Sequence, residues 1–255
     1  MRILLIRHAE PDYTVDSLTP KGRVEAELLS IRLAKYNIRD FYMSPLGRAQ
    51  DTASYTLSKL HRNATTLPWL QEFRGSYPDP ESGTRRIVAW DVKPRIWTEF
   101  PEIADYHLWH KSPAFEGGNV SEIWQETTDG VNELLARYGY HKDGPVWQCE
   151  KNEDFTIALF SHFGISMAVL GYLTDISPMV LWHRTLCLPS SVTEIVTEER
   201  IKGEVAFRIT KLGDLTHLEA AGEKRSTAGL FPECWTGIDS TDPAVNGTLN
   251  NTRLF

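Results

Sequence analysis

Basic side chains follow two apolar stretches of this 255-residue chain. Arg7 and His8 stand at the end of the stretch RILLIR, and His162 follows the stretch FTIALFS. A guanidinium donates paired hydrogen bonds to phosphate oxygens, and an unprotonated imidazole is a nucleophile. Ligands of open α/β sheets bind outside the carboxyl ends of the strands. The pattern therefore predicts a phosphate site with a histidine nucleophile at such an edge.

Two helices with the same start signal are expected next along the chain. The pair Thr-Pro at 19–20 is typical of an N-cap with proline at the first helical position, and spaced apolar residues continue this helix to about Tyr36. After the short strand DFYMS, the pair Ser-Pro at 44–45 repeats the signal for a helix to Leu60. Arg48 therefore falls in the first turn of the second helix, where it can join the strand-end residues.

The rest of the chain alternates between strand and helix patterns. We expect a short strand at 64–67, a helix at 120–138, a strand at 155–161, helices at 164–173 and 178–184, and alternating antiparallel strands at 192–198 and 204–213. This order predicts an α/β fold: a three-layer α/β/α sandwich with a mostly parallel central sheet and one antiparallel edge.

One segment departs from this alternation. Residues 85–118 hold three tryptophans but show neither helical nor strand periodicity. We expect residues 76–118 to form an inserted lid, because loops at the carboxyl edge of such sheets choose the substrate. Since no linker-like tract divides the chain, residues 1–255 are expected to be one domain, with 219–255 as a C-terminal tail.

Composition limits the partners. The net charge of −7 disfavours nucleic acid and anionic membrane surfaces as partners. Cys149, Cys187 and Cys234 are odd in number and widely spaced, which disfavours a disulfide framework or a zinc ribbon. No signal peptide is recognised before the first strand and no apolar run approaches about 18 residues, so we expect a cytoplasmic protein. A homodimer stays open.

Four motifs in order resemble the histidine phosphatase (phosphoglycerate mutase-like) superfamily. They are RHAEP, SPLGRAQDTA, LQEFRG and SHFG, and LTPKGRVEAELLSIRLA is similar to that family's first helix; the resemblance extends to about Leu218. It implies transfer of a phosphoryl group to an active-site histidine, with no cofactor and no metal. The family's catalytic roles carry over to Arg7, His8, Arg48, Glu72 and His162.

Elementary chemistry supports these roles. Phosphoryl transfer is catalysed mainly by positioning and charge stabilisation, which Arg7 and Arg48 would supply. Neighbouring cations keep His8 unprotonated as the nucleophile, and His162 would donate to the phosphate together with backbone N–H groups of the helix after it. Glu72 is expected to protonate the leaving oxygen and then to activate water, with Asp12 as the alternative acid.

The chain departs from the family pattern at three positions near these motifs. Ala9 stands where the family usually has glycine, Thr14 where an asparagine often contacts phosphate, and Phe163 where a glycine usually follows the second histidine. Beyond the catalytic set, the residues expected to bind substrate are Asp12, Thr14, Arg85, Arg86, Trp109, His110 and Phe163.

The leading expectation is a phosphomonoester hydrolase, a cofactor-independent phosphatase of the histidine acid phosphatase type, acting on a small phosphorylated metabolite. A phosphoglycerate-mutase-type phosphoryl transferase is the alternative within the fold, and Arg85 and Arg86 could supply the extra cations that it needs. A catalytically degenerate phosphate-binding regulatory module is the alternative from another functional class.

Overall fold

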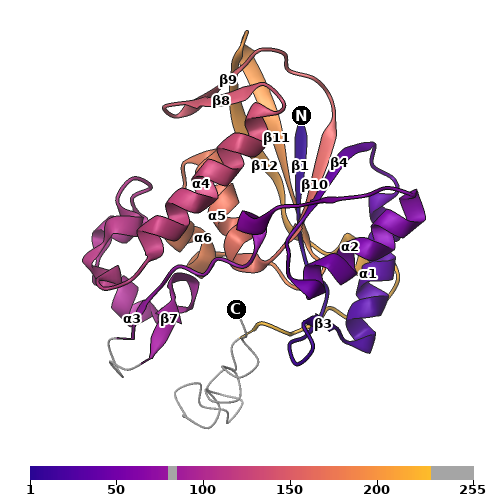
Figure 1. The fold of residues 1–255 in the computed structure, drawn as a ribbon, viewed down its shortest axis with the longest axis horizontal. Helices are drawn as coiled ribbons and strands as arrows, with labels where there is room; N and C mark the ends of the chain where they lie inside the picture. The colour runs from indigo at the N-terminus through magenta and orange to yellow at the C-terminus, as the bar shows by residue number, and fades with distance from the viewer. Residues whose placement is uncertain (80–84, 231–255) are drawn as a thin grey trace.

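The central sheet has eight strands in the computed structural model, which describes residues 1–79 and 85–230 (Figure 1). In order across the sheet they are β5 (Thr65–Thr66), β4 (Ile38–Met43), β10 (Thr156–Ser161), β1 (Arg2–Arg7), β11 (Val192–Ile201), β12 (Glu204–Asp214), β9 (Val146–Cys149) and β8 (Tyr140–Asp143). Strands β5, β4, β10 and β1 run parallel, and β11 pairs antiparallel with β1. The expected fold class is confirmed.

Strand β1 is buried on both faces because helices cover the sheet on both sides (Figure 1). The helices are α1 (Pro20–Leu33) and α2 (Gly47–Leu60) on one side and α4 (Val120–Ala136), α5 (Phe163–Thr174) and α6 (Pro178–Arg184) on the other. Leu4 and Ile6 pack in the cluster with α1 and α2, whereas Ile3 and Leu5 pack in the cluster that contains α5. This alternation follows from the period of two along a strand.

The parallel pairing aligns three strand ends at one edge of the sheet, the lower edge in Figure 1. The N–H of His8 donates to the carbonyl of Ser161 at 2.9 Å, and the N–H of Ser44 donates to the carbonyl of Phe160 at 2.9 Å. His8, Ser44 and His162 are therefore the first residues past β1, β4 and β10. The hydrogen-bond register alone brings them together.

Helix α2 begins differently from the expectation. The Ser-Pro signal at 44–45 predicted the helix start there, but α2 begins at Gly47, and its N-cap residue Leu46 makes no side-chain cap. Asp16 provides the cap instead, because its Oδ2 accepts the Gly47 N–H at 2.7 Å. The Ser44 hydroxyl is used elsewhere, as described below.

The antiparallel half of the sheet includes a hairpin, β8 and β9, that we did not expect from the sequence. The predicted helix at 120–138 ends at Ala136, and the chain turns into β8. Gly144 and Pro145 form its turn, between the paired residues Asp143 and Val146, and Gly144 has φ +58°, a conformation that glycine adopts readily. The Gly-Pro pair at 144–145 was therefore an available turn signal.

The expected insertion is built from short elements packed beside α4 and α6 (Figure 1). They are β6 (Ser76–Pro78), β7 (Arg86–Val88), α3 (Pro94–Trp97) and single 3₁₀ turns at Ala89–Asp91, Pro101–Ala104, Trp109–Lys111 and Pro113–Phe115. The remaining short elements are β2 (Pro11–Asp12), β3 (Ser17–Leu18), a 3₁₀ turn at Pro68–Leu70 and α7 (Thr216–Glu219). Within the described residues, no helix has the length and apolar character required to span a membrane.

Candidate active site

His8 is held in one tautomer. Its Nδ1 lies 2.8 Å from the carbonyl oxygen of Ala9, and a carbonyl can only accept, so Nδ1 carries the hydrogen and Nε2 keeps its lone pair. The side chain is buried, and burial, followed by the charges of Arg48 and Arg7, places its pKa well below the ordinary value. His8 is therefore a neutral imidazole with a free Nε2 at neutral pH. The methyl group of Ala9 does not disturb this arrangement, because the orienting group is the backbone carbonyl.

Both predicted arginines lie beside His8, and each is anchored at one end. Arg7 Nη1 donates to the carbonyl of Cys187 at 2.5 Å, and Arg48 Nη1 pairs with Asp16 Oδ1 at 2.5 Å. The two residues are 8% and 4% exposed, so the guanidiniums are desolvated. Each Nε is buried without a hydrogen-bond partner among the described residues. A buried donor without a partner is costly, and an anion would satisfy both.

His162 lies against His8, with ring centroids 5.1 Å apart. Its Nε2 is 2.7 Å from the Ser44 hydroxyl, and that hydroxyl accepts the Leu46 N–H at 3.2 Å. We assign the Ser44 hydroxyl as the donor to His162 Nε2, because its oxygen already accepts the Leu46 N–H and its proton has no other acceptor among the described residues. The hydrogen of His162 then sits on Nδ1, which is buried without a partner among the described residues.

The pKa of His162 is lowered well below its ordinary value by burial first and then by His8, Arg48 and Arg7. It is therefore a neutral N–H donor. The geometry agrees with a phosphate clamp and not with a second nucleophile, which would need a lone pair on the free nitrogen.

Glu72 follows the 3₁₀ turn at Pro68–Leu70, and its side chain reaches the start of α5. Its Oε1 accepts the N–H of Phe73 at 2.8 Å and that of Ile165 at 3.0 Å, which leaves Oε2 to carry a proton. Burial raises the pKa of Glu72, against the opposing effects of these two N–H groups and of Arg48 and Arg7. The Ile165 N–H at the start of α5, which we expected to contact phosphate, thus holds the carboxyl group.

The pKa of Asp12 is shifted in the opposite direction to that of Glu72. Its Oδ1 accepts both the N–H and the hydroxyl of Thr14, at 3.0 and 2.6 Å, and these bonds lower the pKa of Asp12. A carboxyl group that has already lost its proton at neutral pH has none to donate to a leaving group. The structure therefore favours Glu72 over Asp12 as the proton donor. The same turn engages the exposed Thr14 hydroxyl with Asp12.

Of the residues expected to bind substrate, Phe163 lies beside Arg7, whereas the described contacts of Arg85 and Arg86 lie within the insertion. The ring centroid of Phe163 is 5.8 Å from the Arg7 guanidinium carbon, so this residue borders Arg7. Arg85 is exposed, and its carbonyl accepts the Asp79 N–H. Arg86 directs its guanidinium nitrogens to Ser76 and Gly117 within the insertion. A contact of Arg85 or Arg86 with substrate stays a prediction.

Trp109, which we expected to bind substrate, is buried inside the insertion. Its side chain is fully buried and packs against Phe73, Phe115, Trp124 and Trp182, so it lines no accessible space. Burying so large an apolar surface stabilises the insertion against α4 and α6.

His110 lies next to this aromatic cluster. Its ring packs on Trp124, and its Nδ1 is 3.1 Å from the Ser121 hydroxyl at the start of α4. Its described contacts tie the insertion to α4, and a substrate contact stays a prediction.

Three residues near the site were not expected from the sequence. Asp16 pairs with Arg48 and caps α2, the ring centroid of Tyr13 is 5.4 Å from the Arg48 guanidinium carbon, and Trp90 donates its indole N–H to the Phe73 carbonyl at 3.0 Å. None belongs to a motif of the basic strand ends. Trp90 comes from the insertion, which therefore reaches the acid side of the site.

The segment after β12 returns to the same edge of the sheet. The Ser226 hydroxyl donates to Oε2 of Glu10 at 2.5 Å. Glu10 is two residues after His8, the predicted nucleophile. A Cβ atom placed on Gly229 would lie 2.5 Å from Arg7 Nη2, and the φ of +84° at Gly229 also favours glycine. Part of the predicted tail thus packs on a phosphate arginine, while residues 231–255 lie outside the described residues.

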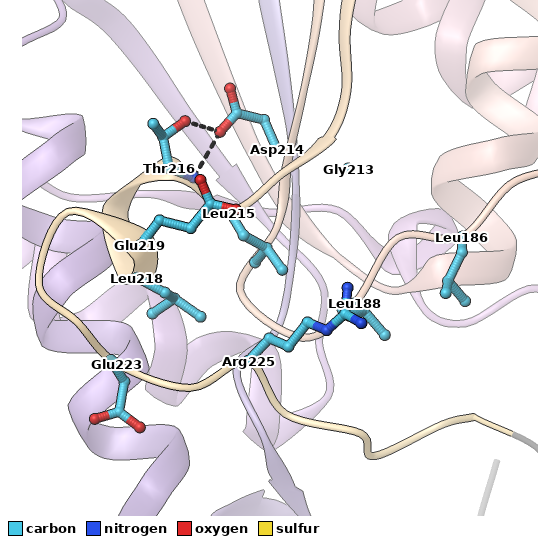
Figure 2. A pocket seen from close by; sticks show the side chains of 10 residues that line it. All are labelled: Leu186, Leu188, Gly213, Asp214, Leu215, Thr216, Leu218, Glu219, Glu223 and Arg225. Carbon is cyan, nitrogen blue, oxygen red and sulfur yellow. Dashed lines mark hydrogen bonds between the residues drawn. The ribbon is translucent and has the colours of Figure 1, made fainter.

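A pocket of about 420 Å³ lies beside this returning segment. Arg225 and Leu188 are among the residues that line it (Figure 2). Leu188 follows Cys187, whose carbonyl anchors Arg7. One lining residue of the pocket is therefore the sequence neighbour of the residue that anchors Arg7.

Comparison with known proteins agrees with the site. A sequence model of the histidine phosphatase superfamily (branch 1) matches residues 3–208. A curated relative, the mitochondrial serine/threonine-protein phosphatase Pgam5 of Caenorhabditis elegans, is 36% identical over 107 residues. That match covers 40% of this chain and only 36% of the relative's length.

Solved structures show the same fold. The phosphoserine phosphatase of Entamoeba histolytica, solved in complex with phosphoserine, is 17% identical with a TM-score of 0.57, covering 85% of this chain and 98% of that one. A mycobacterial glucosyl-3-phosphoglycerate phosphatase with inorganic phosphate is 19% identical with a TM-score of 0.56, over the same shares. Because the family match spans most of the residues that carry the site, this chain belongs to the histidine phosphatase superfamily.

Proposed function

We propose that this protein hydrolyses phosphomonoesters through a phosphohistidine formed on His8. The observation that carries the proposal is a set of three buried nitrogens without partners among the described residues, Arg7 Nε, Arg48 Nε and His162 Nδ1, around a neutral imidazole; with the tautomer assigned to His162, all three are N–H donors. Unpaired buried donors cost about 1–3 kcal/mol each, and a phosphate group would satisfy them together.

In the first step, His8 Nε2 attacks phosphorus while the bond to the ester oxygen breaks. The two guanidiniums and His162 Nδ1–H stabilise the charge on the phosphoryl oxygens. Glu72 gives its proton, carried on Oε2, to the leaving alkoxide, so the products are an alcohol and phosphohistidine. The raised pKa of Glu72 suits this role, because the acid must hold its proton near neutral pH.

In the second step, water attacks the phosphohistidine. The carboxylate of Glu72, now deprotonated, takes the proton of the water as the N–P bond breaks. Inorganic phosphate leaves, His8 recovers its lone pair and Glu72 recovers its proton. The cycle thus needs no further reactant.

A small phosphorylated metabolite is the proposed substrate class. Arg7, His8, Arg48 and His162 are each at most 8% exposed, so the phosphate must descend into a recess. The solved relatives include phosphatases with phosphoserine, 3-phosphoglyceric acid and inorganic phosphate bound, whereas Pgam5 is named a protein phosphatase. A recessed site favours the small ester over a phosphorylated side chain on a folded protein.

A panel of phosphoesters tests this function. Phosphate release would be measured from phosphoserine, 3-phosphoglyceric acid, an aryl phosphate and a phosphoserine peptide, with His8→Ala as the inactive control. We expect release from one or more small esters and at least tenfold lower kcat/KM on the peptide. Binding without turnover would instead support a regulatory module, and isomerised phosphoglycerate without free phosphate would support a mutase.

The remaining expectations stay predictions. A cytoplasmic location, no nucleic-acid or membrane partner, and an oligomeric state up to a homodimer follow from the sequence alone. The same holds for the role of residues 76–118 as a lid that sets substrate choice, for which the contact of Trp90 with the site is the supporting observation.

A further inference from the structure

The insertion reaches the proposed acid through one side chain. A Cβ atom built on Gly164 would lie 2.7 Å from Glu72 Oε1, 2.7 Å from Trp90 Cδ1 and 2.9 Å from Trp90 Nε1. The carboxyl group and the indole ring therefore share one face of Gly164. Only glycine leaves room for both at the first turn of α5, because any side chain would displace one of them.

Trp90 also holds the peptide that follows the acid. Its indole N–H donates to the Phe73 carbonyl at 3.0 Å, while the N–H of Phe73 donates to Glu72 Oε1 at 2.8 Å. Both ends of residue 73 are thus fixed, one by the carboxyl group and one by the indole. The Ile165 N–H completes the support from α5.

We infer that Trp90 is a positioning residue for Glu72, which fixes the carboxyl group and keeps water from it so that it stays a proton donor. This inference rests on the proposed function of Glu72. Arg48 on α2 and Arg7 on β1 are the charged groups that act on the carboxyl, and the N–H groups of Phe73 and Ile165 also favour its ionised form. Burial is the effect that opposes all of these, and the indole ring supplies part of that burial.

The test compares pH profiles of kcat/KM for an alkyl ester, phosphoserine, and for an aryl phosphate. Without the indole, water reaches Glu72 and its pKa falls toward the ordinary value, so the acid loses its proton at lower pH. We expect Trp90→Ala to move the basic limb of the phosphoserine profile down by about one pH unit and to lower kcat/KM at pH 7 about tenfold. The aryl ester, with its weakly basic leaving group, should lose about threefold or less.

Two variants separate positioning from general stability. Trp90→Phe keeps a ring over Gly164 but loses the hydrogen bond to the Phe73 carbonyl. Its basic limb should lie close to the pH of the limb of the unsubstituted enzyme. Trp97→Ala is the matched control: it removes another buried indole of the insertion, one that stacks on His183 with centroids 5.1 Å apart. It should leave both limbs in place.

Equal losses on both esters with an unmoved limb for Trp90→Ala would overturn the inference. If that variant does not fold, Gly164→Ala replaces it, since its Cβ must push Glu72 or the indole away, and an unmoved limb there would have the same meaning. The unsubstituted enzyme separates the proposed function from the role of Trp90. If it releases no phosphate from any ester, the proposed function fails. If it is active and the Trp90 variants do not change its pH profiles, only the positioning role is rejected.

Discussion

Replacing Glu72 with Gln removes the proposed acid without removing its anchors. The amide oxygen of Gln can accept the same N–H bonds from Phe73 and Ile165, so we expect the fold to lose no more than about 1 kcal/mol of stability. A positioned general acid contributes about 10² to 10⁴-fold. Turnover of alkyl phosphates should therefore fall by at least about 10²-fold, which is about 2.7 kcal/mol of lost transition-state stabilisation.

The assay is a comparison of leaving groups. An aryl phosphate needs little protonation as its bond breaks, so Glu72→Gln should reduce its hydrolysis about tenfold or less. Asp12→Asn is the matched control and should change both activities only slightly, because this carboxyl group is already ionised at neutral pH through its bonds to Thr14. Equal losses on both ester classes in Glu72→Gln would refute the acid role, and a leaving-group effect in Asp12→Asn would assign that role to Asp12.

Two further predictions concern buried groups around the site. Ser44→Ala removes the hydroxyl that bonds to Nε2 of His162, so turnover should fall about tenfold or more and the free energy of unfolding by about 1–3 kcal/mol. Ser44→Thr keeps a hydroxyl and should retain activity. Full activity in Ser44→Ala would contradict the tautomer assigned to His162. Burial raises the pKa of Glu25 from 4.5 to about 7, so the folded state binds this proton more tightly than the unfolded state does. The folded state should therefore lose about 3 kcal/mol of stability as the pH rises from below 4.5 to above 7. Urea unfolding at pH 5 and pH 8 should show this loss in the unsubstituted protein and not in Glu25→Gln. The same pH dependence in both proteins would reject the assignment to Glu25.

The strand-end residues were predictable because an apolar run and the residue that follows it are local features of the sequence. Apolar runs that end in Arg7 and before His162 identify parallel strands, and parallel strands end at one edge. The placement of Arg48 near His8 followed from the helix expected after the second strand, even though Asp16 and not Ser44 caps that helix. A cap supplied from a distant loop leaves no signal at the helix start.

The rest of the site depends on contacts that no local pattern contains. Trp90 and Trp109 lie in the same aperiodic insertion, yet one borders Glu72 and the other is fully buried among aromatic rings. The return of Gly229 to Arg7 joins residues more than two hundred positions apart. Hydrophobic burial decides such placements through the whole fold, so composition could indicate only that the insertion is aromatic.

The phosphohistidine on His8 is the central claim, and trapping it is the most direct measurement. The enzyme would be quenched during turnover of a ³²P-labelled ester, digested, and the labelled peptide identified by mass spectrometry, with His162→Ala and His8→Ala in parallel. We predict acid-labile, base-stable label on the peptide that contains His8, reduced in yield but on the same peptide in His162→Ala, and absent in His8→Ala. Label on any other residue, or turnover of the ester with none on His8 at times when the intermediate accumulates, would contradict the account.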